Sequence, residues 1–276
     1  MNAFNAAVTQ FFQIVLAPFA SYPLAGLLTV SAVTGMAMTW AFGKTSHQRA
    51  LRRVADQSRA QLLAIRLFRD DLTVTLRCQK ELLRLATLRL LHSLPPMLVM
   101  AAPLGLFLVQ LSLYYAHYAL RPGDVAVVEL SLAPDAWERF RDVKLEAPNS
   151  VTVETEGLRD RANRTVYWRI RPKSSEPATL RWRVGDVTIE KQLAVADAPQ
   201  RLQLVSVRRP GPGFFDRLLH PAEAGFSAGT PVVGVEVHYR DRQTPIWGLH
   251  LPWWLTFFMV SMVVALMSRR GFRVSF

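Results

Sequence analysis

The sequence has no Asp, Glu, Lys or Arg between Met1 and Gly43, although the 276-residue chain carries a net charge of +12. Cysteine is also nearly absent, and because Cys78 is the only one, a disulfide within the chain is excluded. No H-E-x-x-H, G-x-S-x-G, Walker or G-x-G-x-x-G motif occurs, and the six histidines are dispersed without metal-ligand spacing. These absences argue against an enzyme, and we expect no catalytic residue, no cofactor and no metal site.

The excess positive charge lies beside long apolar runs. Residues 44–95 hold eleven basic and four acidic side chains, residues 121–247 hold nineteen and seventeen, and the tail after Ser268 adds three arginines. Basic segments that flank apolar runs follow the positive-inside rule of membrane proteins. The distribution therefore favours a membrane protein over a nucleic-acid-binding protein, and we expect no DNA partner.

Three uncharged runs have the length of a membrane span: residues 24–42, 96–120 and 248–268. About twenty apolar residues, at roughly 1.5 Å each, cross a hydrocarbon core of ~30 Å. The sequence therefore predicts three transmembrane helices in a lipid bilayer. No positive region precedes the first run, so residues 1–43 are expected to hold a short interfacial segment and an uncleaved first helix.

The arginines set the expected orientation. Residues 44–95 and the basic tail, 269–276, are expected in the cytoplasm, which leaves the N-terminus and residues 121–247 outside. The predominance of Arg over Lys suits a GC-rich bacterial genome. The predicted location is thus the bacterial inner (plasma) membrane, with the N-terminus outside and the C-terminus in the cytoplasm.

The cytoplasmic segment has the pattern of two amphipathic helices. Lys44–Leu94 contains neither Gly nor Pro, and its apolar residues recur at spacings of three and four. The acidic pair in Arg69–Leu72 divides it into nearly equal halves, which predicts an antiparallel helical hairpin. Its basic face is either a solvated linker or a docking surface for ribosomal RNA or lipid headgroups. The candidate docking residues are Arg52, Arg53, Arg59, Arg66, Arg77 and Arg84.

Residues 121–247 change to the period-two pattern of β-strands. Seven or eight short strands predict an extracytoplasmic immunoglobulin-like β-sandwich, so the fold class is an α+β integral membrane protein. A hairpin is expected with Gly185–Asp186 as its turn. One strand should bury a tryptophan-centred face, and a strand paired with it a second such face. These faces are Val166, Trp168 and Ile170, and Leu180, Trp182 and Val184.

Two features lie outside these patterns. The insert Arg208–Phe226 breaks the strands with Pro and Gly and holds an amphipathic turn, which rests either on the membrane surface or on the sandwich edge. Polar residues within apolar spans usually face other helices or a wet cavity. The candidate groove residues are Gln110, Ser112 and Thr34, and Gln110 is the costliest of them to bury.

The order of these segments resembles the YidC-type membrane protein insertase superfamily, with an outer β-sandwich inserted. The stretch LHSLPPMLVMAAPLGLFL is similar to the family's entry into the helix after the hairpin, with Pro95, Pro96, Met97 and Pro103 at the matching positions. The segment from Phe4 to Val15 is similar to the amphipathic helix that precedes the core of bacterial members.

The resemblance implies non-enzymatic insertion or chaperoning of membrane segments through a polar groove. The basic hairpin would then receive nascent membrane proteins or the ribosome. The competing hypothesis is a membrane-anchored envelope binding or scaffold protein, whose sandwich binds an extracytoplasmic partner protein. The two hypotheses differ in whether the helices enclose a groove.

Overall fold

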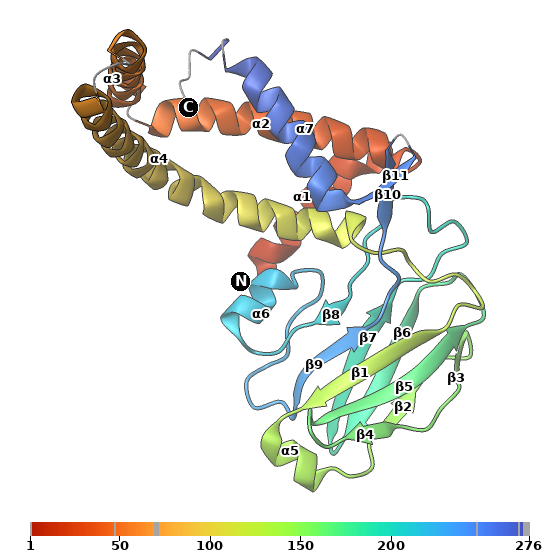
Figure 1. Ribbon diagram of the computed structural model, residues 1–276. Helices are drawn as coiled ribbons and strands as arrows, with labels where there is room; N and C mark the ends of the chain where they lie inside the picture. The colour runs from red at the N-terminus through yellow and green to blue at the C-terminus, as the bar shows by residue number, and fades with distance from the viewer. Residues whose placement is uncertain (1, 47, 69–71, 247, 270, 273–276) are drawn as a thin grey trace. The chain divides into compact units, whose positions relative to one another are not determined.

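The computed structural model describes residues 2–46, 48–68, 72–246, 248–269 and 271–272. It is an α+β protein of long apolar helices and antiparallel sheets (Figure 1). The chain divides into a first unit, Met1–Leu27 with Leu106–Thr256, and a second unit, Leu28–Gly105 with Phe257–Phe276. The helices are α1 (Asn2–Leu16), η1 (Ala17–Phe19), α2 (Pro23–Thr45), α3 (Gln48–Leu67), α4 (Leu72–Tyr115), α5 (Pro134–Arg139), α6 (Phe214–Leu219) and α7 (Trp253–Ser268).

Two described helices, α2 and α4, are long and apolar enough to cross a membrane by length and composition. The prediction of three spans is therefore wrong for residues 248–268. Leu249–Pro252 forms a strand, β11, that pairs with β10 (Gln243–Ile246) across a turn in which Gly248 has φ +81°. The helix begins only at Trp253, and its 16 residues are shorter than a span. Apolar character alone did not distinguish the strand from the helix that follows it.

The paired prolines do not end a helix, which corrects the expected boundary between hairpin and span. Helix α4 is continuous over 44 residues and contains Pro95, Pro96 and Pro103. Each proline removes one amide donor from a helix interior. The surrounding Leu- and Ala-rich sequence favours the helix at the other positions. The second predicted span also ends early, because α4 stops at Tyr115 rather than at residue 120.

The expected turn of the hairpin, at Arg69–Leu72, lies mostly outside the described residues. Helix α3 ends at Leu67 and α4 begins at Leu72, so the two predicted arms are helical on either side. Within the second unit, α2 and α7 approach closely: a Cβ on Gly35 would lie 2.4 Å from the backbone oxygen of Ser261. A residue without a side chain is needed there, as at many interfaces between membrane helices.

Two antiparallel sheets form the core of the first unit (Figure 1). One has the order β3-β5-β1-β9-β8 with β4 also paired to β5, and the other has the order β2-β6-β7. The strands are β1 (Ala126–Leu132), β2 (Lys144–Glu146), β3 (Val151–Val153), β4 (Leu158–Asp160), β5 (Thr165–Pro172), β6 (Ala178–Val184), β7 (Val187–Leu193), β8 (Arg208–Arg209) and β9 (Val232–Val237). The predicted β6–β7 hairpin is confirmed, with Val184 opposite Val187 and Gly185 at φ +60°.

The inner faces of the two sheets share one hydrophobic core. Both predicted tryptophan faces are buried, and the rings of Trp168 and Trp182 lie 6.1 Å apart. The expectation that these faces belong to paired strands is wrong, because β5 and β6 lie in different sheets. The alternation of each strand identified the buried face, but not the sheet to which the strand belongs.

Residues 201–207 form no strand, although their apolar and polar residues alternate, and only the two-residue β8 follows them. Their backbone donors are used elsewhere. The amide of Leu202 donates to the carbonyl of Ala20 (2.8 Å), and the amide of Val205 donates to the carbonyl of Leu113 (2.8 Å). This segment therefore bonds to the ends of the helical segments instead of extending a sheet.

Candidate functional site

The predicted groove residue Gln110 is buried against α1. Its Oε1 accepts a hydrogen bond from the hydroxyl of Thr9 (3.1 Å), and only 5% of the residue is exposed. The ring of Phe12 packs on Phe107 one turn away, with centroids 5.1 Å apart. The cost of a polar amide in an apolar helix is offset by this contact.

The other two predicted groove residues bond within their own helices. The hydroxyl of Ser112 donates to the carbonyl of Val109 (2.7 Å), and that of Thr34 donates to the carbonyl of Val30 (2.8 Å). Gln110 and Ser112 lie two positions apart on α4, whereas Thr34 belongs to the second unit. Such local bonds satisfy hydroxyls in an apolar helix without a water-filled groove.

The predicted basic face is open to solvent where its side chains are described. Arg53, Arg59, Arg66, Arg77 and Arg84 are all exposed, whereas the side chain of Arg52 lies outside the description. Arg59 pairs with Asp56 (3.3 Å) and Arg84 with Glu81 (3.1 Å), each within one helical turn. Exposed pairs of this kind are worth little energetically, so both arginines remain able to bind an anionic partner.

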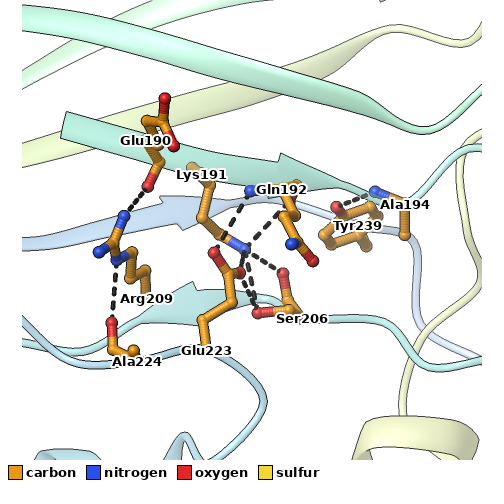
Figure 2. Close-up of polar contacts among 9 residues, drawn as sticks. All are labelled: Glu190, Lys191, Gln192, Ala194, Ser206, Arg209, Glu223, Ala224 and Tyr239. Carbon is orange, nitrogen blue, oxygen red and sulfur yellow. Dashed lines mark hydrogen bonds and ion pairs between the residues drawn. The ribbon is translucent and has the colours of Figure 1, made fainter. Parts of the chain in front are cut away.

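A buried polar cluster that we did not predict lies between β7 and the insert (Figure 2). Lys191 is completely buried. Its Nζ donates to the backbone oxygens of Gln192 (3.2 Å) and Ser206 (2.5 Å), to the Oγ of Ser206 (3.0 Å) and to the carboxylate of Glu223. The hydroxyl of Ser206 also donates to Glu223, and the amide of Gln192 does so at 3.3 Å. The cluster thus ties β7 to two irregular segments.

The chemistry of this cluster is that of an ion pair. A serine beside a lysine is a known nucleophile–base arrangement, but here the carboxylate of Glu223 also accepts from both. Burial lowers the pKa of Lys191, and the negative charge of Glu223 opposes that shift. Because Lys191 has no solvent exposure and donates to several acceptors, we assign the cluster a structural role, in which the loss of either charge would leave the other buried and unpaired. The inward position of Lys191 in the alternating strand β7 was the sequence signal for it.

A cleft of about 600 Å³ lies beside β2, the edge strand of the three-stranded sheet. Its floor is apolar and includes Leu145, Val153 and Trp168, and its rim is charged. The chain at Gly157 passes over the floor so closely that a Cβ would lie 3.1 Å from the indole of Trp168. The cleft is lined by residues 141–145, 153–157, 159, 166 and 168.

Arg159 fixes one wall of this cleft. Its guanidinium donates to the carbonyls of Trp137 (3.0 Å), Phe140 (2.9 Å) and Arg141 (2.8 Å), and it stacks 3.9 Å from the centroid of the Trp137 ring. These contacts hold α5 and the chain before β2 against β4. The cleft is therefore bounded by a wall whose position is set by several charge-assisted hydrogen bonds.

The charges on the rim fall into two groups. Glu154 pairs with Arg171 (2.5 Å) and Arg169 (2.8 Å), and the hydrogen bond from Arg171 is the main reason that the pKa of Glu154 is lowered. The other group is exposed and makes no ion pair within the part of the chain that the structure describes. Its members are Arg141, Asp142, Lys144 and Glu156. These four are available to a ligand.

Comparisons with protein-family models, with curated proteins and with solved structures find no match to this chain.

Proposed function

We propose that this is a membrane-anchored binding protein whose two-sheet part holds an extended segment of a partner protein in the cleft beside β2. The observation that carries the proposal is the cleft itself, with an apolar floor, a charged rim on which four side chains make no ion pair among the described residues, and an adjacent strand edge. Apolar pockets surrounded by polar groups are the usual form of a peptide site. In this proposal the sheets form an immunoglobulin-like sandwich outside the cytoplasm.

The free edge of β2 supplies the backbone part of such a site. Strand β2 pairs with β6 on one side, with Lys144 opposite Arg183 and Glu146 opposite Arg181. It has no second strand partner among the described residues. A partner segment added along a sheet edge gains backbone hydrogen bonds, and its alternate side chains enter neighbouring pockets. Leu145 and Trp168 would receive apolar side chains there.

The anchoring part of the proposal is supported by the two candidate spans. Helix α2 begins at Pro23 and α4 ends at Tyr115, and the hydroxyl of Tyr115 donates to the carbonyl of Pro23 (3.1 Å). These two helix ends therefore lie beside each other, and we place them at the same depth in the membrane. With the arginine-rich segment in the cytoplasm, this level and the sheets lie on the outer side of a bacterial inner membrane.

The proposal is tested by photocrosslinking in cells with the full-length protein. A photoreactive amino acid at Glu156 is expected to yield an adduct with an envelope protein, because this side chain is exposed on the cleft rim. The matched control is the same amino acid at Thr188, an exposed position on β7 at the other edge of the three-stranded sheet. Equal adducts from both positions, or none from Glu156, would contradict binding at the cleft.

A second candidate function is the insertase-like activity implied by the family resemblance. It is favoured by the exposed arginines of α3 and α4 and by the continuity of α4, which carries Arg77 and Arg84 on the same helix as its apolar stretch. The buried contact between Gln110 and α1 favours the binding function instead. Crosslinking to ribosome-bound nascent chains from Arg66 and Gln110 separates the two, because only an insertase yields adducts from both.

A further inference from the structure

A second, smaller cavity lies in the first unit, between the first turn of α2, the end of α4 and the strand β10. Its volume is about 220 Å³, and Leu24, Leu27 and Tyr115 contribute to a mainly apolar wall. Gln200 and Arg242 bring polar groups to it. It shares no lining residue with the cleft beside β2.

Arg242 is the feature of this cavity that points to a ligand. It is 8% exposed, and its guanidinium donates to the carbonyls of Tyr114 (3.5 Å), Arg201 (3.4 Å) and Gln200. Its guanidinium also stacks 5.0 Å from the centroid of the Tyr118 ring, and it makes no ion pair with any residue that the structure describes. Because a guanidinium keeps its charge, a buried cation lines the cavity without a counter-charge.

The start of α2 adds to the positive potential. The first amides of a helix have no partner within it, and the helix dipole places partial positive charge at this end. Pro23 and Leu24, at the start of α2, line the cavity together with Arg242. A buried arginine beside a helix N-terminus is a favourable environment for a phosphate group.

The position of the cavity identifies the source of that phosphate. Pro23 and Tyr115 are the adjacent ends of the two candidate spans, so the cavity lies at the level where lipid headgroups meet the protein. Leu24 is 38% exposed and leaves an apolar entrance beside α2. We propose that the cavity binds the phosphate of an anionic phospholipid headgroup, with Arg242 as its ligand and the acyl chains outside along the spans. This inference rests on the membrane anchoring proposed above but not on the cleft.

The test measures lipid binding to the delipidated full-length protein in detergent by native mass spectrometry. Phosphatidylglycerol is expected to bind at least tenfold more tightly than phosphatidylcholine, and Arg242→Gln to weaken phosphatidylglycerol at least tenfold. Arg240→Gln is the matched control, because Arg240 is exposed two residues away. It is expected to bind like the wild type. Equal binding of the two lipids, or undiminished binding to Arg242→Gln, would overturn the site.

A second variant and a competition experiment complete the test. Because Arg242→Gln also removes hydrogen bonds to three carbonyls, Leu24→Trp provides a variant that fills the cavity and leaves the arginine in place. It is expected to abolish the preference for phosphatidylglycerol, and a retained preference would contradict the site. Excess inorganic phosphate is expected not to displace the lipid, whereas full displacement would identify a free-phosphate site instead. Crosslinking from Glu156 does not depend on lipid binding. The absence of a lipid site can therefore be distinguished from the absence of a partner site at the cleft.

Discussion

Replacing Glu223 by Gln tests the role assigned to the buried cluster around Lys191. The substitution keeps the shape of the side chain and an oxygen that can accept from Ser206, but it removes the negative charge. Lys191 is left as a completely buried ammonium, held only by neutral acceptors. We therefore expect Glu223→Gln to destabilise the two-sheet part strongly, although the side chain keeps nearly the same shape.

The size of the effect follows from burial. Lys191 has 0% side-chain exposure and Glu223 has 9%, so solvent screens this pair very little. Removing one partner of a buried ion pair costs about 3–5 kcal/mol. Since the amide of Gln replaces part of the lost hydrogen bonding, we expect about 3 kcal/mol, a large share of the roughly 5–15 kcal/mol that stabilises a typical domain.

The assay is urea unfolding of the full-length protein in detergent, followed by tryptophan fluorescence, to which the buried Trp168 and Trp182 contribute. The matched control is Glu190→Gln. It breaks the cross-strand pair with Arg181 (2.9 Å), whose side chains are 59% and 47% exposed, and is expected to cost no more than about 1 kcal/mol.

A double-mutant cycle decides the cause of any loss. When Lys191→Met is combined with Glu223→Gln, no buried charge remains, so the double variant should be less destabilised than the sum of the single variants by about 2 kcal/mol. If Glu223→Gln costs less than about 1 kcal/mol, or if the two substitutions are additive, the ion pair does not stabilise this part of the protein and our reasoning is wrong.

Three further predictions concern other parts of the first unit. Gln110→Leu should lower the free energy of unfolding by about 0.6–1.7 kcal/mol, because it leaves the hydroxyl of Thr9 without its partner. Thermal unfolding in detergent measures this loss, and an unchanged midpoint would contradict the prediction. Phe215 is 74% exposed on α6 and can carry a spin label in a Cys78→Ser background. If the insert contacts the bilayer, the label in nanodiscs should be accessible to oxygen and protected from a water-soluble nickel reagent. The reverse pattern would favour packing at the sheet edge. Burial lowers the pKa of His220 below 6.5. The stability that its neutral ring contributes is therefore present above pH 6.5 and is lost as the pH falls through the folded-state pKa. His220→Asn should flatten this part of the curve of stability against pH, and an unchanged curve would refute the assignment.

Most strands of the two core sheets and the β6–β7 hairpin were predictable because their signals are local. Alternation from Ala178 to Val184 identifies a buried face, and Gly185 allows the tight turn that follows. The start of α7 was not predictable in this way. Leu249–Pro252 is uncharged and continuous with the apolar helix after it, and its pairing with Gln243–Ile246 makes it a strand. Hydropathy measures transfer to an apolar environment and does not identify the hydrogen-bond partner.

The buried cluster shows the same limit for a candidate site. The inward position of Lys191 follows from the alternation of β7, and a buried lysine demands an acceptor. Its acceptors, Ser206 and Glu223, lie 15 and 32 residues further along the chain, in segments without regular structure. No periodicity relates such positions. The prediction that a lysine needs a partner was available from the sequence, whereas the identity of the partner required the fold.

Helix α1 explains why a costly glutamine can be placed in an apolar helix. The hydroxyl of Thr9 on α1 donates a hydrogen bond to the side chain of Gln110. The side-chain amide of Asn5, also on α1, donates to the carbonyl of Arg217 (3.0 Å) and so holds α6. The same end of α4 receives the amide of Val205. The helical ends are thus joined to other segments of the first unit by hydrogen bonds, not by the chain connections alone. These hydrogen bonds hold the segments that contact the end of α4 in defined positions within the first unit.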